Sequence, residues 1–140
     1  MPIVAAIDRS ERAESVIKEA ASLAAVCDLP LHVVNVGELD VPTAQGGYNP
    51  DRDRDLARKR AKATARETAR EFGVEEFEPV GLLGDPAEEL VRYCTEQDAE
   101  YVVVSARKRS SFGQALFGSV TQALLLNVDC PVVATPHESA

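Results

Sequence analysis

Five short apolar runs, separated by segments of helical periodicity, constrain the fold of this chain more than any other feature. The runs lie at residues 3–7, 31–36, 78–83, 101–104 and 131–134. Strands that are apolar throughout belong to parallel sheets with both faces covered, and the crossovers between such strands are right-handed. We therefore predict an α/β fold: a doubly wound parallel five-stranded sheet, strand order 3-2-1-4-5, with helices on both faces.

The segments between the runs carry helix signals. Asp85-Pro86 is the clearest, because aspartate is a favoured helix cap and proline suits the first helical position. Gly73 is typical of the residue that ends a helix. The expected helices follow a cap at Ser10, run from Asp51 to about Phe72, follow Asp85 and follow Ser119.

Length and composition narrow the class of protein. The 140 residues fit one domain, residues 1–140, and no stretch reaches the apolar length of a membrane helix. The three cysteines are far apart, and the N-terminus carries no charged leader, so we expect a cytoplasmic protein with reduced thiols and no membrane partner. The net charge of −8 argues against a nucleic-acid partner, because phosphate backbones need a basic face.

Polar residues follow the first and fourth predicted strands, where the strand order reverses. Asp8 ends the first strand and Ser105 ends the fourth. Ligands of doubly wound sheets bind outside the carboxyl ends of the strands at this point. Asp8 can also be read as an acidic residue that only ends a strand and supports the next helix.

A basic cluster, Arg107 to Arg109, follows Ser105 and leads to Gly118-Ser119 at the start of a helix. Small residues and cations before a helix N-terminus are typical of a phosphate site, because the backbone N–H groups and the helix dipole favour an anion there. A solvated surface loop is the other reading of this segment.

These motifs resemble the universal stress protein family. The resemblance rests on Asp8-x-Ser10, Gly84-x-Pro86, Gly118-Ser119 and Cys130-Pro131-Val132-Val133. The nucleotide loop of that family reads Gly, two residues, Gly, nine residues, Gly-Ser, and here Ser105 and Lys108 replace its first two glycines. The resemblance implies a cytoplasmic, usually dimeric, stress-associated regulatory protein. It would bind ATP or another adenine nucleotide, with or without magnesium, and hydrolyse it little or not at all.

Carried over residue by residue, the resemblance puts the nucleoside at the first two strands and the phosphates at the last helix. Arg107 and Lys108 then supply charge where the family has glycine geometry. We identify no catalytic residue and no metal ligand. The expected nucleotide-binding residues are Ile7, Asp8, Ser10, Val36, Ser105, Arg107, Lys108, Gly118, Ser119, Val120 and Thr121.

The last predicted strand, Pro131 to Ala134, is an edge of the sheet in the 3-2-1-4-5 order. A short apolar edge strand invites pairing with another strand, so we expect a homodimer through this edge. The alternative function is a nucleotide-independent module, in which the fold serves only dimerisation and the docking of a protein partner that the sequence does not identify.

Overall fold

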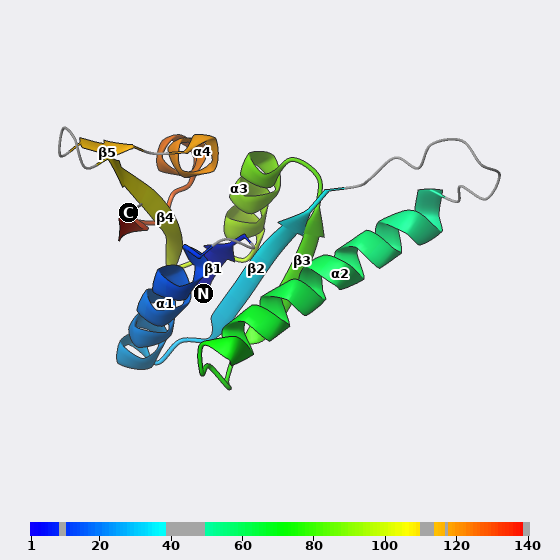
Figure 1. Ribbon diagram of the computed structural model, residues 1–140, viewed down its shortest axis with the longest axis horizontal. Coiled ribbons are helices and arrows are strands. Elements are labelled where there is room, and N and C mark those ends of the chain that lie inside the picture. Colours follow the sequence, from blue (N-terminus) through cyan, green and yellow to red (C-terminus); the bar gives the residue numbers. More distant parts are fainter. Residues whose placement is uncertain (9–10, 39–49, 110–113, 117, 139–140) are drawn as a thin grey trace.

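The computed structural model describes residues 1–8, 11–38, 50–109, 114–116 and 118–138. Strands and helices largely alternate along the described chain (Figure 1). In chain order the elements are β1 (Ile3–Ile7), α1 (Ala13–Cys27), β2 (Leu31–Gly37), α2 (Pro50–Glu71), β3 (Glu78–Leu83), α3 (Pro86–Glu96), β4 (Tyr101–Arg109), β5 (Gln114–Leu116), α4 (Ser119–Asn127) and β6 (Val132–Glu138).

The main sheet is parallel and has the order β3-β2-β1-β4-β6. Since β6 is the fifth of the predicted strands, this order is 3-2-1-4-5, and the predicted fold is confirmed. Ile3 of β1 is in register with Leu31 on one side and with Tyr101 on the other. The order therefore reverses between β1 and β4, and the carboxyl ends of these strands meet at one edge of the sheet.

Two segments differ from the predicted elements. β4 continues past Val104 to Arg109, and β5 pairs antiparallel with its end, Arg107 opposite Leu116. The prediction that Arg107 and Lys108 lie in a loop is therefore wrong. The apolar run stops at Val104, but the strand is continued by backbone pairing with β5 and β6, which a hydrophobicity pattern does not reveal. β6 likewise begins at Val132 and runs to Glu138, beyond the predicted end.

The helices begin close to the predicted caps. Asp85 caps α3, with its carboxylate accepting a hydrogen bond from the backbone N–H of Glu88 at 3.0 Å. Gly118 is the cap of α4. α1 begins at Ala13 with Arg12 at its cap, whereas the predicted cap, Ser10, lies outside the described residues.

Successive residues of each strand point to opposite faces of the sheet, so the sheet has two apolar faces. Helices cover both of them. One buried cluster joins α1 and α2 to the sheet, and its members include Ile3, Ala5, Val16, Ile17, Val33, Ala65, Ala69 and Val103. The other joins α3 and α4 to the opposite face, and its members include Val4, Val34, Leu90, Cys94, Val102, Val104 and Leu124.

α2 packs unusually close to β3. A Cβ atom added to Gly81 would lie 2.2 Å from the carbonyl oxygen of Arg58 and 2.5 Å from the backbone nitrogen of Lys62. On the helix side of this contact the buried residues are small: Ala61, Ala65 and Ala69. The glycine is therefore required by the close approach of two backbones.

Candidate functional site

A pocket of about 120 Å³ lies at the carboxyl ends of β1 and β2, against the middle of β4 at Val104 and Ser105, and beside α1, α3 and α4. This is the point of the sheet where ligands of doubly wound folds bind. Helix α3 contributes Leu90, and α1 contributes Ala13 and Val16. The lining includes six residues that the sequence predicted for a nucleotide site: Ile7, Asp8, Val36, Ser105, Val120 and Thr121.

The other predicted residues are placed as follows. Gly118 and Ser119 are exposed at the N-terminus of α4, directly before Val120 of the lining. The backbone of Arg107 and Lys108 belongs to β4. Ser10 lies outside the described residues.

An ion pair lies at the rim of the pocket. The Asp8 carboxylate accepts a hydrogen bond from the guanidinium Nη2 of Arg12 at 3.3 Å, and the two side chains are 58% and 21% exposed. Both residues line the pocket. Arg12 was not among the predicted site residues. Asp8 lies before α1 and Arg12 is the N-cap of that helix, so the pair depends on how the chain enters α1, which local spacing does not indicate.

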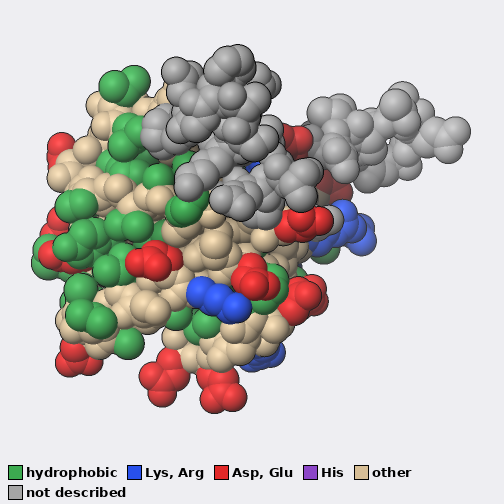
Figure 2. All heavy atoms as spheres, turned by 60° about the vertical axis from the view of Figure 1, so that its left-hand side comes forward, with side chains coloured by type: hydrophobic (Ala, Val, Ile, Leu, Met, Phe, Trp, Pro, Cys, Tyr) green, Lys and Arg blue, Asp and Glu red, His purple; other side chains and the backbone are tan. Residues whose placement is uncertain are grey.

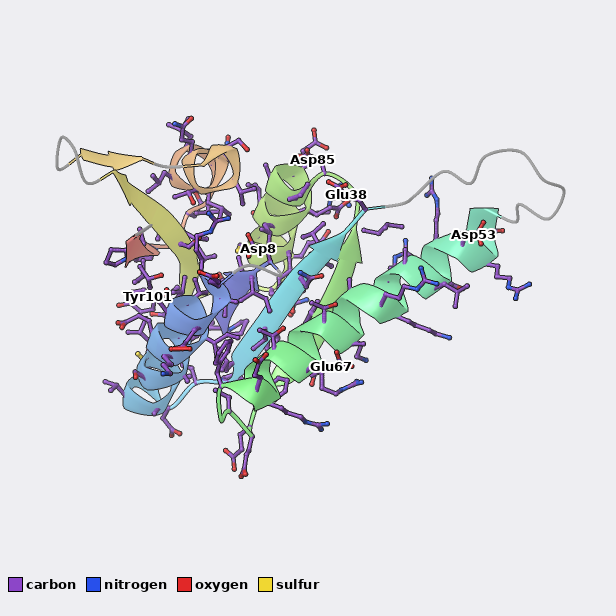
Figure 3. All side chains as sticks on the ribbon, in the orientation of Figure 1. Asp8, Glu38, Asp53, Glu67, Asp85 and Tyr101 are labelled. Carbon is purple, nitrogen blue, oxygen red and sulfur yellow. The ribbon has the colours of Figure 1, made fainter. Side chains whose placement is uncertain are left out.

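Exposed carboxylates gather on the same side of the sheet. Asp8 follows β1, Glu38 follows β2 and Asp85 precedes α3, and all three are exposed (Figure 3). The carboxyl-end edge therefore carries acidic groups near the pocket, together with the guanidinium of Arg12 and the basic residues Arg107 to Arg109 of β4.

Two buried polar side chains fix the walls of the pocket. The Thr121 hydroxyl donates to the carbonyl oxygen of Ser105 at 3.1 Å, which ties α4 to β4. The Asn35 amide donates to the carbonyl oxygen of Ile7 at 3.1 Å, which ties β2 to the end of β1. Because the Thr121 proton is used within the protein, this residue shapes the wall. Sequence reasoning missed Asn35, which lies inside an apolar run.

The backbone before α4 leaves open space. Gly118 has φ −69° and ψ 170°, which any residue adopts, and an added Cβ would meet nothing within 4 Å. The first backbone N–H groups of a helix have no partner within that helix, so they are available to an anion. Glycine at this position is thus required neither by conformation nor by the packing of the protein itself.

The described cysteines do not have the properties of activated nucleophiles. Burial raises the pKa of the Cys94 thiol to about 12 and also raises that of Cys130. Cys27 is exposed at the end of α1, far along the helix from the pocket residues Ala13 and Val16. Within the described residues no group of three His, Cys, Asp or Glu side chains could hold a metal ion, and no helix is long and apolar enough to cross a membrane.

Fold and pocket together define a doubly wound α/β protein with a ligand pocket at the switch point of its sheet. The chain belongs to the universal stress protein family, whose model matches residues 1–136.

Three relatives illustrate the range of similarity. A universal stress protein of Mycolicibacterium smegmatis is 44% identical over 61 residues, less than half of either chain: 43% of this one and 45% of that one. Universal stress protein YxiE of Bacillus subtilis is 28% identical over 94% of this chain and 95% of its own. The universal stress protein of Archaeoglobus fulgidus has a solved structure that is 34% identical, with a TM-score of 0.67, covering 96% of this chain and 97% of that one. A second structure of the Archaeoglobus protein is a complex with dAMP, at 31% identity, a TM-score of 0.64 and 96% coverage of both chains.

Proposed function

We propose that this protein is a stress-associated regulatory protein that binds an adenine nucleotide at the carboxyl ends of β1 and β4. The observation that carries the proposal is the pocket between Ile7, Val36 and Thr121, which lies where the strand order reverses. The dAMP complex of the Archaeoglobus relative supports the class of ligand.

In this proposal the base lies between Ile7 and Val36, with Asp8 as the polar partner of the nucleoside. Apolar side chains there suit a flat ring, and the carboxylate of Asp8 accepts hydrogen bonds from hydroxyl or amino groups. The volume of about 120 Å³ is below that of a pocket enclosing a drug-sized ligand, so the rest of the nucleotide extends toward solvent.

The phosphate end of the ligand lies at Gly118 and Ser119, where the N-terminus of α4 is open. Arg107 and Lys108 add positive charge to this region as point charges, and Ser10, Ser105 and Val120 complete the proposed set. Magnesium is an optional companion of the ligand. The proposal includes little or no hydrolysis, and it takes residues 1–140 as one cytoplasmic domain.

Two measurements test this function. The protein is purified, denatured and analysed by mass spectrometry for co-purified adenylates. The ligand-free protein is then titrated with adenine nucleotides in a calorimeter and in a thermal-shift assay. A ligand at about 100 times its Kd stabilises the fold by about 2.7 kcal/mol, which raises the Tm by several degrees. No co-purified adenylate and a Tm change below about one degree at millimolar nucleotide would contradict the proposal.

The proposal also includes a homodimer through β6. The backbone N–H of Val102 donates to the carbonyl oxygen of Pro131, and Val102 is in register with Val132. Backbone groups alternate in direction along a strand, so Pro131 and Val133 face β4 while Val132 and Ala134 face outward. Within the described chain β6 pairs with β4 alone, which leaves these outward groups available to a second copy.

Pro136 falls on the same outward side, where it offers no N–H group. Pairing between copies is therefore confined to the first part of β6. Two-fold symmetric pairing of this segment uses the same surface on both chains, so it closes after two copies.

One observation favours the alternative function, a nucleotide-independent interaction module. Leu125 and Leu126 of α4 are 49% and 83% exposed, and α4 leads into β6. Figure 2 turns the side of the molecule that carries β6 toward the viewer, and hydrophobic side chains gather over part of that face. A protein that dimerises and docks a partner by this face, with no change of Tm in nucleotide, would fit the alternative.

A further inference from the structure

The end of β4 is paired along both of its edges. β6 pairs with β4 from Val102 to Lys108, and therefore occupies one edge throughout. β1 pairs with the other edge at its start, as in the register of Ile3 with Tyr101. β5 pairs with β4 from Arg107 to Arg109, so it must lie on the edge that β1 occupies further back. Arg107 and Lys108 thus have a backbone neighbour on each side.

This pairing bears on how the site can hold phosphate. Loops that cradle several phosphates turn successive backbone N–H groups toward one anion. A strand with neighbours on both edges directs its N–H groups to those neighbours instead. Lys108 lies where the family loop would have its second glycine, and the N–H groups of Arg107 and Lys108 belong to the sheet. On the edge that β1 and β5 share, the pairing with β1 ends at Val103 and the pairing with β5 begins at Arg107, so the N–H group of Ser105 stays open together with those at the start of α4.

The charge near the pocket is mixed, because exposed carboxylates lie at the carboxyl-end edge and the basic residues Arg107 to Arg109 end β4. Asp8, Glu38 and Asp85 are exposed carboxylates at the carboxyl-end edge of the sheet (Figure 3). The guanidinium of Arg12 at the rim is shared with Asp8. The carboxylates oppose each further phosphate on a ligand and the cations of β4 attract it, so the selection rests on the backbone pairing.

We propose that this site selects adenine nucleotides with a single phosphate group over di- and triphosphates, because the β4–β5 pairing occupies the end of β4 and, among the described backbone donors, leaves those of Ser105 and the start of α4 for one anion. The inference rests on the proposed function and narrows its ligand class. The first phosphate binds at Gly118 and Ser119. The second and third phosphates find no open backbone donors at Arg107 and Lys108, whose N–H groups belong to the sheet.

A titration series tests the selection. Adenosine, AMP, ADP and ATP are each titrated into the ligand-free full chain at constant ionic strength, and ADP and ATP are measured with and without magnesium. We expect AMP to bind at least tenfold more tightly than adenosine, and ATP no more tightly than AMP. ATP binding more than threefold tighter than AMP overturns the inference and leaves the proposed function intact. Binding of none of the four overturns the proposed function itself.

Two variants test the structural cause of the selection between AMP and ATP. Ala115→Pro opposes the β4–β5 pairing, since proline lacks an N–H and holds φ near −65° where an antiparallel strand needs about −140°. Ala115→Ser is its matched control. We expect the proline variant alone to shift the affinity ratio toward ATP by at least threefold, and an unchanged ratio in a folded variant contradicts the role of β5.

The second variant, Glu38→Gln with Asp85→Asn, removes charge from the edge and keeps a good cap at the start of α3. It is expected to strengthen ATP binding more than AMP binding, with the difference growing as salt is lowered. Equal effects on both ligands contradict the role of these carboxylates.

Discussion

The hydroxyl oxygens of Ser15 and Thr135 lie 3.1 Å apart, although 120 positions separate the two residues in the chain. The Ser15 hydroxyl also lies 3.1 Å from the backbone carbonyl oxygen of Arg12. The Thr135 hydroxyl lies 3.3 Å from the backbone carbonyl oxygen of Val104. Three contacts share two hydroxyl protons, so one contact lacks a proton at any moment. Because Arg12 and Val104 both line the pocket, these bonds join two of its walls through α1, β6 and β4.

Thr135→Val is expected to lower the free energy of unfolding by about 1 kcal/mol, because it removes the hydrogen bonds of the Thr135 hydroxyl with Ser15 and Val104 at nearly unchanged volume. Urea unfolding measures the loss. Ser15→Ala and the double variant complete a mutant cycle. The two losses should not add, and additivity within about 0.3 kcal/mol would show that the two hydroxyls act independently.

Gly118→Val is expected to weaken AMP binding at least tenfold, because the new side chain fills the space before α4 where the phosphate is proposed to bind. The protein itself accommodates a Cβ there, with nothing within 4 Å, so the loss of stability should stay near the 1 kcal/mol of a poorer helix cap. Gly118→Ser, a smaller residue and a good cap, is the matched control. Calorimetry and urea unfolding separate the two effects, and unchanged AMP affinity in the valine variant would place the phosphate elsewhere.

Ala134→Pro is expected to convert the proposed dimer into a monomer of 15.1 kDa. Ala134 is exposed and its N–H faces away from β4, so proline removes a donor from the free edge without removing one from the β4–β6 ladder. Val133 would be a poorer choice, since its side chain packs against the core cluster of α1. Light scattering after size exclusion gives the mass, with Ala134→Ser as the control. A dimer mass in the proline variant would show that the contact between copies lies on another surface.

The stability of the protein should fall as the pH drops below about 6.5, in part because of His32. Burial lowers the pKa of this histidine below 6.5, partly opposed by the carboxylate of Glu78, and its Nδ1 lies 2.6 Å from the Tyr93 hydroxyl. The unfolded chain therefore binds the proton more readily, and stability that is complete above 6.5 is lost below it. Urea unfolding between pH 7.5 and 5.5 should show a smaller slope in His32→Gln. Equal slopes would assign the pH dependence to other groups.

Sequence patterns were most informative where burial decides the structure. The apolar runs gave β1 and β3 with their bounds, since those strands end where burial ends. Asp85 was predictable because its cap bond joins residues three apart. β4 beyond Val104 was not, because its continuation depends on backbone pairing with β5, at Leu116, and with β6, at His137, and polar residues give no apolar pattern for that pairing.

The same distinction applies to the pocket. Ile7, Asp8 and Ser105 were found because they lie where apolar runs end at the switch point, although β4 itself continues past Ser105. Arg12 and Asn35 were missed because their positions depend on where α1 starts and on the pairing of β1 with β2. Neither follows from local composition.

Gly81→Ala is expected to lower the free energy of unfolding by about 3 kcal/mol, the upper end for an added methyl group in a packed core, because the methyl would overlap the backbone of α2. Gly73→Ala is the comparison: its φ of 84° adds strain of about 1–2 kcal/mol, but nothing lies within 4 Å of the new atom. Urea unfolding of the two variants gives the difference. A loss at Gly81 no larger than that at Gly73 would mean that α2 moves aside easily.

The direct contact of α2 with β3 also means that packing against the sheet and exposure to solvent fall to different residues of this helix. Gly81, Ala61 and Ala65 set the distance between helix and sheet with almost no side-chain volume. The outward residues, such as Glu67, take no part in that fit (Figure 3). Related chains can therefore exchange nearly every polar residue on the outer side of this helix and keep the same architecture, which makes it a surface where new recognition can evolve without cost to the fold.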